Sequence, residues 1–283
     1  MSGKDFGPAQ APVRIALGDD GERRRGAPSA QVSDALDEVL AVRAAEVGRA
    51  ALEVVDVGAG TGGFAVRLAK LGHHVTVVDP SPDALAAARW RAAELGVTLT
   101  AVQGEASEIA GLVGDGAADL VVCHNVLEYV DSPAAAMAAI ARVLRPGGTV
   151  SVLAANVVAA VLQRALAGRY EEARRLLTSN AGDPVVPVPP PAPAAAVPAP
   201  AVPIPASGMT DHRRFTLAGL TALIEGAGLR AGEPHGVRIF AGLLPGGGAD
   251  PASADALREL EAAAAGYPAL RDIAARLHIF GHR

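Results

Sequence analysis

Residues 54–63 read Val-Val-Asp-Val-Gly-Ala-Gly-Thr-Gly-Gly, a β-branched run that passes directly into a glycine-rich turn. Glycine tolerates positive φ angles and lets a ligand approach the backbone closely. The spacing of Gly58, Gly60 and Gly63 also satisfies the dinucleotide fingerprint Gly-x-Gly-x-x-Gly. We therefore predict a strand, a ligand-binding turn and a helix in that order.

Short apolar runs alternate with helical segments on both sides of this turn. Strands are predicted at 53–57, 74–78, 98–102, 120–123, 149–153, 236–240 and 276–280, and helices at 63–71, 82–94, 133–144, 156–178, 217–227 and 257–264. This alternation is typical of a parallel sheet covered on both faces. The predicted fold class is α/β: a doubly wound, Rossmann-like, mostly parallel sheet with an antiparallel edge and helices on both faces.

Four parts are expected along the chain. Residues 1–50 form a flexible N-terminus and a leading helix for which Ser33 looks like the N-cap, and residues 51–155 form the ligand-binding core. Residues 156–208 form a helical excursion and a Pro/Ala-rich insertion, whose tract at 184–205 is expected to be polyproline-like. Residues 209–283 complete the sheet of the same domain.

Composition excludes several classes of function. The net charge of −5 and the pI of about 5.8 argue against broad, non-specific nucleic-acid binding, although a local basic patch is compatible with them. The single cysteine, Cys123, excludes an intrachain disulfide and disfavours a thiolate metal site. Neither a membrane-spanning run nor the apolar stretch of a signal peptide is found. We expect a cytoplasmic protein with no structural metal and no membrane partner.

Two acids flank the glycine-rich turn. Asp56 precedes Gly58 by two residues, which suits a cationic α-amino group and not a pyrophosphate; the alternative is a strand-end aspartate that caps the turn. Asp79 ends the second strand, where a carboxylate can accept both hydroxyls of a ribose. Its alternative is a helix N-cap, but Ser81 followed by proline already supplies that signal.

Four segments together resemble the class I S-adenosylmethionine-dependent methyltransferases across about residues 35–155. They are Asp56-Val57-Gly58-Ala59-Gly60-Thr61-Gly62, Val77-Val78-Asp79, Leu120-Val121-Val122-Cys123-His124-Asn125-Val126-Leu127-Glu128 and Val143-Leu144-Arg145-Pro146-Gly147-Gly148. The resemblance implies a seven-stranded sheet and S-adenosylmethionine as the cofactor. It also implies that the methionine end of this methyl donor lies over the ends of the first and fourth strands.

A narrower resemblance is to the bacterial tRNA carboxymethoxyuridine methyltransferase family, which esterifies a carboxylate on a wobble uridine. It is carried by His124-Asn125-Val126-Leu127-Glu128-Tyr129-Val130, Gly236-Val237-Arg238-Ile239-Phe240, Leu260-Glu261 and Leu277-His278-Ile279. It implies donor-binding roles for Gly58, Ala59, Asp79, Ala106, Ser107 and His124. That family has a lysine-rich segment where this chain has the neutral tract 184–205, so both tRNA and small-molecule acceptors stay open.

The complete predicted cofactor site contains Asp56, Gly58, Ala59, Gly60, Gly62, Asp79, Ala106, Ser107 and His124. Methyl transfer from a sulfonium needs proximity and alignment, and no protein nucleophile. A carboxylate acceptor is already ionised at neutral pH, so the protein must supply a cation to position it. Arg238, Arg213 and Arg214 are candidates, each with a solvated arginine as the alternative.

His124 and Arg238 are the predicted catalytic pair. His124 either contacts the donor or serves as a base for a hydroxyl acceptor, and its alternative is a satisfied strand-end histidine. Tyr129 either lines the acceptor pocket or packs on the following helix. The predicted function is methyl transfer to a carboxylate or hydroxyl acceptor, with a small-metabolite O- or N-methyltransferase as the alternative. A nicotinamide-dependent oxidoreductase and a catalytically silent scaffold are the competing classes.

Overall fold

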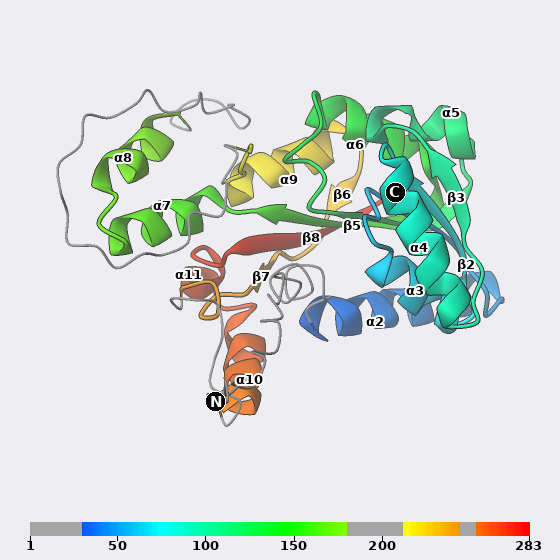
Figure 1. Cartoon of the computed structure of the whole chain (residues 1–283), viewed down its shortest axis with the longest axis horizontal. Coiled ribbons are helices and arrows are strands. Elements are labelled where there is room, and N and C mark those ends of the chain that lie inside the picture. The colour runs from blue at the N-terminus through cyan, green and yellow to red at the C-terminus, as the bar shows by residue number, and fades with distance from the viewer. Residues whose placement is uncertain (1–29, 180–211, 244–252) are drawn as a thin grey trace, which may run out of the picture.

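The computed structural model describes residues 30–179, 212–243 and 253–283 (Figure 1). The predictions of a flexible N-terminus before residue 30 and of a polyproline-like tract at 184–205 lie outside these residues. No helix in the described part of the chain is long and apolar enough to cross a membrane.

One mixed sheet organises the described residues. Its strands are β1 (Glu53–Val57), β2 (His74–Asp79), β3 (Thr100–Gln103), β4 (Ala118–His124), β5 (Leu144–Ala155), β6 (Arg230–Ala231), β7 (His235–Val237) and β8 (Arg276–His282). The order is β3-β2-β1-β4-β5-β8-β6, and β7 also pairs with β8. Strands β1 to β5 are parallel, whereas β8 runs antiparallel to β5, β6 and β7. The α/β prediction with an antiparallel edge is confirmed.

The predicted number of seven strands is wrong for the described residues, which contain an eight-stranded sheet. The edge position beside β8 is divided between two short strands. β6 pairs with Gly281 and His282, and β7 pairs with residues 276–278. Strand β6 has only two residues, too few to show a period-2 pattern in the sequence.

Helices cover both faces of the sheet (Figure 1). They are α2 (Ala30–Val47), α3 (Gly63–Lys70), α4 (Pro82–Glu94), α5 (Ile109–Val113), α6 (Pro133–Val143), α7 (Val157–Leu166), α8 (Tyr170–Ser179), α9 (Leu217–Gly226), α10 (Ala254–Ala264) and α11 (Pro268–Arg271), with a 3-10 turn at Ala106–Glu108. Ser33 lies buried inside α2, so its prediction as an N-cap is wrong. The predicted helical excursion corresponds to α7 and α8, which lie beyond the end of β5.

Alternate residues of each central strand pack into two separate cores. In β1, Val54 faces a cluster that includes Leu36 of α2 and Leu68 of α3. Its neighbour Val55 faces a second cluster that contains side chains of α5, α6 and α9. Every residue of β4 is buried. These two cores hold the carboxyl ends of β1, β2 and β4 in one fixed row.

Candidate functional site

A cavity of about 310 Å³ lies at the carboxyl ends of β1, β2 and β4. In doubly wound sheets, ligands bind at this edge of the sheet, and the volume is that of a small-molecule site. Its lining consists of Val57, Gly58, Val78, Asp79, Pro80, Gly104, Glu105, Ala106, Asn125, Val126, Tyr129 and Val130.

The glycine-rich turn forms one wall of this cavity, because its glycines have no side chains that would occupy the space. The N–H of Gly58 donates to the carbonyl of Val78 at 2.7 Å, and a Cβ at Gly58 would lie 2.5 Å from a methyl group of Val126. Gly62 begins α3 with φ of 75°, and a Cβ there would lie 2.8 Å from Cβ of Ala88. Both positions therefore require glycine.

The carboxylate of Asp79 ties the turn to the end of β2. Its Oδ2 accepts the N–H of Gly60 at 3.0 Å, and its Oδ1 accepts the N–H of Ser81 at 2.9 Å. The N-cap of α4 is Ser81, whose hydroxyl accepts the N–H of Ala84 at 3.2 Å, so Asp79 does not cap that helix. A carboxylate oxygen has two lone pairs. Asp79 can therefore accept further hydrogen bonds from hydroxyl groups in the cavity.

Asp56 lies buried beneath the turn and not in the cavity lining. Burial raises the pKa of Asp56 from 3.8 to about 7, the N–H of Ala65 in the first turn of α3 donates to it and lowers the pKa, and nearby Asp79 raises it further. Within the described residues, Oδ2 of Asp56 has no hydrogen-bond partner. The observed contact matches the alternative of a strand-end aspartate that caps the turn, and direct contact with an α-amino group stays a prediction.

The nine predicted cofactor residues fall into two groups. Gly58, Asp79 and Ala106 line the cavity, whereas Asp56, Ala59, Gly60, Gly62, Ser107 and His124 lie outside its lining. The sequence analysis missed Asn125, Val126 and Val130 as lining residues. Asn125 has a φ of 58°, a conformation in which asparagine is several-fold enriched. An asparagine directly after a buried strand was the signal that could have identified it.

His124 belongs to a buried chain of hydrogen bonds at the end of β4. Its Nε2 lies 2.7 Å from the hydroxyl of Ser151, which lies 2.8 Å from Nε2 of His278. The ring of Phe64 contacts His124 edge-on at 4.7 Å between centroids. Burial, together with His278 and Arg276, holds the pKa of His124 well below its ordinary value. The imidazole is therefore neutral and a weak base.

The three predicted acceptor cations differ in what they contact. Nη1 of Arg213 donates to the carbonyl of Val130 at 2.6 Å, so Arg213 holds the loop that follows β4. Nη1 of Arg214 donates to the carbonyl of His212 at 3.1 Å. Arg238 follows β7 with a φ of 58°. Tyr129, which lines the cavity, is 63% exposed and contacts the ring of His212 in a tilted arrangement, with 4.2 Å between ring centroids.

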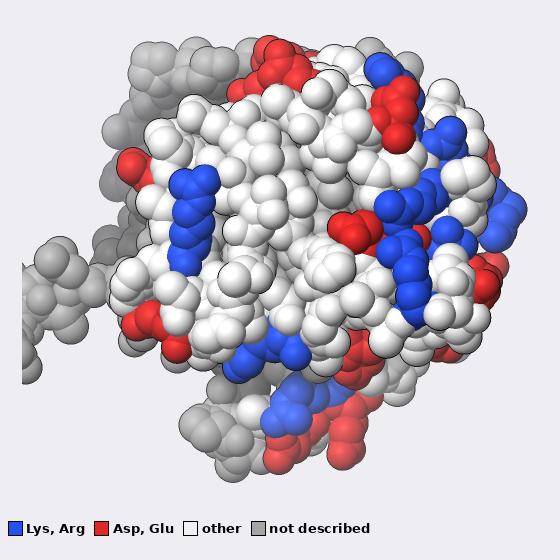
Figure 2. Space-filling view, turned by 90° about the vertical axis from the view of Figure 1, so that its right-hand side faces the viewer, with Lys and Arg blue, Asp and Glu red and all other residues white. Residues whose placement is uncertain are grey.

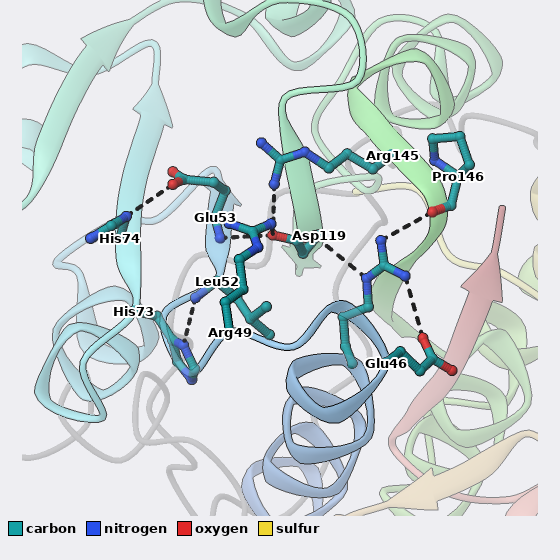
Figure 3. A network of polar contacts seen from close by, with 10 residues as sticks. Glu46, Arg49, Leu52, Glu53, His73, His74, Asp119, Arg145 and Pro146 are labelled. Atoms are coloured by element: carbon teal, nitrogen blue, oxygen red, sulfur yellow. Dashed lines mark hydrogen bonds and ion pairs between the residues drawn. The ribbon is translucent and has the colours of Figure 1, made fainter.

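A different polar network lies at the amino end of β4, away from the cavity (Figure 3). The buried carboxylate of Asp119 accepts from Arg49 at 2.5 Å, from Arg145 at 2.7 Å and from the N–H of Glu53 at 3.0 Å. Nε of Arg43 lies 3.4 Å away. Burial would raise the pKa of Asp119, but these partners outweigh it and lower the pKa. Among the described residues, no group of three His, Cys, Asp or Glu side chains could hold a metal ion.

A family model described as a methyltransferase domain matches residues 55–152, the segment that carries the turn, Asp79 and the strand end at Asn125. This segment is a class I methyltransferase domain. The predicted class I resemblance is confirmed, and the family implies S-adenosylmethionine as the methyl donor, as predicted.

The chain is similar to two kinds of curated relative. Over 103 residues this chain is 39% identical to the ubiquinone biosynthesis O-methyltransferase of Aeromonas salmonicida, covering 36% of this chain and 43% of that protein. Over 138 residues the chain is 32% identical to the tRNA 5-carboxymethoxyuridine methyltransferase of Escherichia coli K12, covering 48% of this chain and 51% of that protein. The chain thus spans about half the length of the curated relatives it matches.

Solved structures resemble a larger part of the chain. A methyltransferase from Methanosarcina mazei aligns with a TM-score of 0.54 and 17% identity over 83% of this chain and 93% of that one. One from Mesorhizobium loti aligns with a TM-score of 0.53 and 17% identity over 82% and 91%. These likenesses extend the fold of a methyltransferase domain beyond residue 152.

Proposed function

We propose that this chain transfers a methyl group from S-adenosylmethionine to a carboxylate or hydroxyl oxygen of an acceptor. The observation that carries the proposal is the cavity at the carboxyl ends of β1, β2 and β4, with Asp79 at one wall and Asn125 and Tyr129 at another. The family that matches this segment supports the same donor.

In this proposal the residues of the chain bind and orient both reactants. Asp79 accepts hydrogen bonds from the ribose hydroxyls, and the turn at Gly58 lets the donor approach the backbone. When bound, S-adenosylmethionine supplies an electrophilic methyl group on a sulfonium. The apolar side chains of Val57, Val126 and Val130 in the lining of the cavity would exclude water from a bound donor. Catalysis then rests on proximity and alignment.

The two kinds of relative are compatible with two kinds of methyl acceptor. These are a modified tRNA wobble uridine and a small metabolite. One face of the molecule, on the side of β3, has basic side chains with acidic ones among them and a broad neutral area (Figure 2). Arg213 is engaged by backbone carbonyls and does not offer a free phosphate contact. Non-specific affinity for a polyanion needs several such contacts, so these features favour the small metabolite.

Donor binding tests the proposal first. We expect S-adenosylhomocysteine, the demethylated form of the donor, to bind in calorimetric titration, and NADH not to bind. Asp79→Ala should weaken that binding by about 1–3 kcal/mol through lost hydrogen bonds to a charged group. Asp83→Ala, at an exposed position in the first turn of α4, is the matched control. Binding of NADH without S-adenosylhomocysteine would instead indicate a nicotinamide-dependent oxidoreductase.

Methyl transfer is tested with radiolabelled donor and two acceptor pools, bulk tRNA and a small-molecule cell extract, followed by size fractionation. Label in the small fraction alone would exclude the tRNA acceptor. Donor binding with no labelled product from either pool would contradict the enzymatic function and favour a silent scaffold.

A further inference from the structure

A chain of buried polar side chains crosses the sheet from β4 through β5 to β8, and the proposed donor site gives no role to two of its members. His124 pairs with Leu153 of β5, which in turn pairs with His278 of β8. Ser151 lies two residues before Leu153, so its side chain is on the same face and bridges the two imidazoles. We call His124, Ser151 and His278 the histidine chain.

The surroundings of the histidine chain are apolar. Leu153, Val237 and Phe280 belong to one hydrophobic core, and the ring of Phe280 lies 4.7 Å from that of His278 between centroids. Ser151 and His278 are at most 1% exposed. Burial of polar groups in such a core costs free energy unless hydrogen bonds compensate for it. Where a sequence breaks the hydrophobic pattern of a core in this way, a functional reason is expected.

The number of protons limits how the histidine chain can be hydrogen-bonded. Both imidazoles are neutral, because burial lowers the pKa of His124 well below its ordinary value and that of His278 to about 3. Each ring therefore carries one N–H, and Ser151 has one O–H to donate. The Nε2 atoms of His124 and His278 lie 2.7 and 2.8 Å from Oγ of Ser151. At least one Nε2 must donate to this oxygen, since a single O–H serves only one of them.

The second ring nitrogen of His124 indicates which Nε2 donates. Among the described residues, Nδ1 of His124 is buried without a hydrogen-bond partner, whereas the same atom of His278 is not both buried and unpartnered. A proton on Nδ1 of His124 would be an orphaned buried N–H, which is rare in folded proteins. The favoured arrangement therefore has Nε2–H of His124 donating to Ser151 and the hydroxyl of Ser151 donating to His278. Nδ1 of His124 then carries a lone pair.

We propose that Ser151 and His278 are positioning residues for His124: they hold its imidazole as the Nε2–H tautomer, so that Nδ1 accepts a hydrogen bond from the α-ammonium group of the methyl donor. The inference deepens the proposed function, on which it rests. The resemblance that implies a donor contact for His124 gives no role to Ser151 or His278. The other tautomer would present an N–H to the ammonium group and oppose its binding.

His124 is placed beside the proposed donor site. It lies one residue before Asn125 of the cavity lining and is 9% exposed. The ring of Phe64, in the first turn of α3 after the glycine-rich turn, contacts it edge-on and restricts its rotation. An ammonium group has three N–H donors, so a contact with His124 is compatible with the predicted contact with Asp56.

Nuclear magnetic resonance of the histidine ring nitrogens tests the tautomer directly, because protonated and unprotonated nitrogens have well separated 15N shifts. We compare the wild type with Ser151→Ala, Ser151→Thr and His278→Leu, and His124→Gln assigns the signals. The matched control is Thr149→Val, since the hydroxyl of Thr149 makes a similar contact between the same two strands, 3.2 Å from Nδ1 of His282. Calorimetric titration of the same proteins gives the Kd for S-adenosylhomocysteine.

We expect a single Nε2–H tautomer of His124 in the free wild type, and a changed 15N shift of Nδ1 when S-adenosylhomocysteine binds. In His278→Leu the hydroxyl of Ser151 can donate to His124, and in Ser151→Ala the Nε2 of His124 has no partner, so both tautomers should be populated. The Kd should then rise roughly three- to tenfold, as expected for the loss of one hydrogen bond.

The control variants should behave as the wild type does. Ser151→Thr keeps the hydroxyl, and Thr149→Val removes one that does not contact the histidine chain, so tautomer and Kd should be unchanged in both. If Ser151→Ala fails to fold, as judged by circular dichroism, His278→Leu carries the comparison.

An Nδ1–H tautomer of His124 in the wild type would overturn the inference, as would an unchanged tautomer and Kd in both Ser151→Ala and His278→Leu. An equal rise of the Kd in Thr149→Val would assign the loss to looser packing between β5 and β8 and overturn the positioning role. A single Nε2–H tautomer in a wild-type protein that does not bind S-adenosylhomocysteine would instead refute the proposed function, and the inference with it.

Discussion

Gly58 shows how a single missing Cβ shapes the site. Its φ of 63° favours glycine, and its position also brings the backbone close to Val126. Gly48 has a similar φ of 66° but nothing within 4 Å of its missing Cβ. The two glycines therefore separate the cost of the backbone conformation from the cost of a steric clash.

We expect Gly58→Ala to destabilise the protein more than Gly48→Ala. The left-handed conformation should cost both variants about 1–2 kcal/mol, and the contact of 2.5 Å at Gly58 should add about 1–3 kcal/mol by overpacking. Urea unfolding monitored by circular dichroism gives both values. Equal losses in the two variants would mean that Val126 moves aside without cost.

Asp56 should make stability depend on pH. Its pKa is raised from 3.8 to about 7 in the folded protein, so the unfolded chain releases this proton at lower pH than the folded chain does. The contribution of Asp56 is therefore full below about pH 4 and is lost as the pH rises to 7, by roughly 1.4 kcal/mol per pH unit at most. Asp56→Asn removes this pH-dependent contribution. The variant should therefore gain stability relative to the wild type as the pH rises from 5 to 8.

Urea titrations of both proteins at several pH values measure this difference. A stability difference that does not change with pH would show that the folded pKa is ordinary. Repeating the titration with saturating S-adenosylhomocysteine tests the predicted ligand role, because a bound α-ammonium group in contact with Asp56 would lower its pKa and flatten the dependence.

At the scale of elements, the turn after β7 ends a strand that the sequence predicted to continue. The prediction placed a strand at 236–240, but β7 ends at Val237. The next N–H groups donate to the two oxygens of Glu261 in α10 and not to a neighbouring strand. Hydrophobic alternation could not reveal this partner, which comes from a helix about 20 residues away.

Glu261→Ala should destabilise the protein by about 2–4 kcal/mol, because it leaves three backbone N–H groups without an acceptor. Affinity for S-adenosylhomocysteine should change little, since this turn does not line the cavity. Chemical unfolding and calorimetry measure the two quantities. Glu259→Ala, on the exposed side of the same helix, should match the wild type, and an equal loss there would exclude the explanation.

Local patterns predicted the parallel half of the sheet and the turn well. The predicted strand at 53–57 and the helix at 82–94 coincide with β1 and α4, because a β-branched run before glycine and a Ser-Pro start are signals within a few residues. The contact of Arg276 with the lining residue Asn125 was not predicted, because the two residues are 151 positions apart in the sequence. Pairing of β8 with β5 and β7 brings the two together, and no sequence spacing encodes that contact.

Across the whole molecule, opposite ends of β4 have different electrostatic arrangements. The amino end surrounds one buried acid, Asp119, with three arginines from α2, the segment after α2 and β5. The carboxyl end opens into the cavity. Paired charges at the amino end stabilise the fold, while the carboxyl end provides the lining of the cavity.

Asp119→Asn should lower the free energy of unfolding by about 3–5 kcal/mol at pH 7, because it leaves arginines without their buried partner. The pKa of Asp119 is lowered in the folded protein, so its contribution is present above the unfolded value near 4 and is lost as the pH falls through the folded value. The wild type and the variant should therefore converge in acid. Asp115→Asn, an exposed partner of Arg142, is the control; divergence at low pH would contradict the assignment.

The position of β8 also has a consequence for how the protein is made. Strand β5 pairs with β4 on one side, and its other side stays open until residues 276–282 have left the ribosome. At ordinary translation rates the nascent chain spends on the order of ten seconds with that edge uncovered. An uncovered edge recruits strands from other chains, so newly made copies should depend on chaperones during this interval more than the finished protein does.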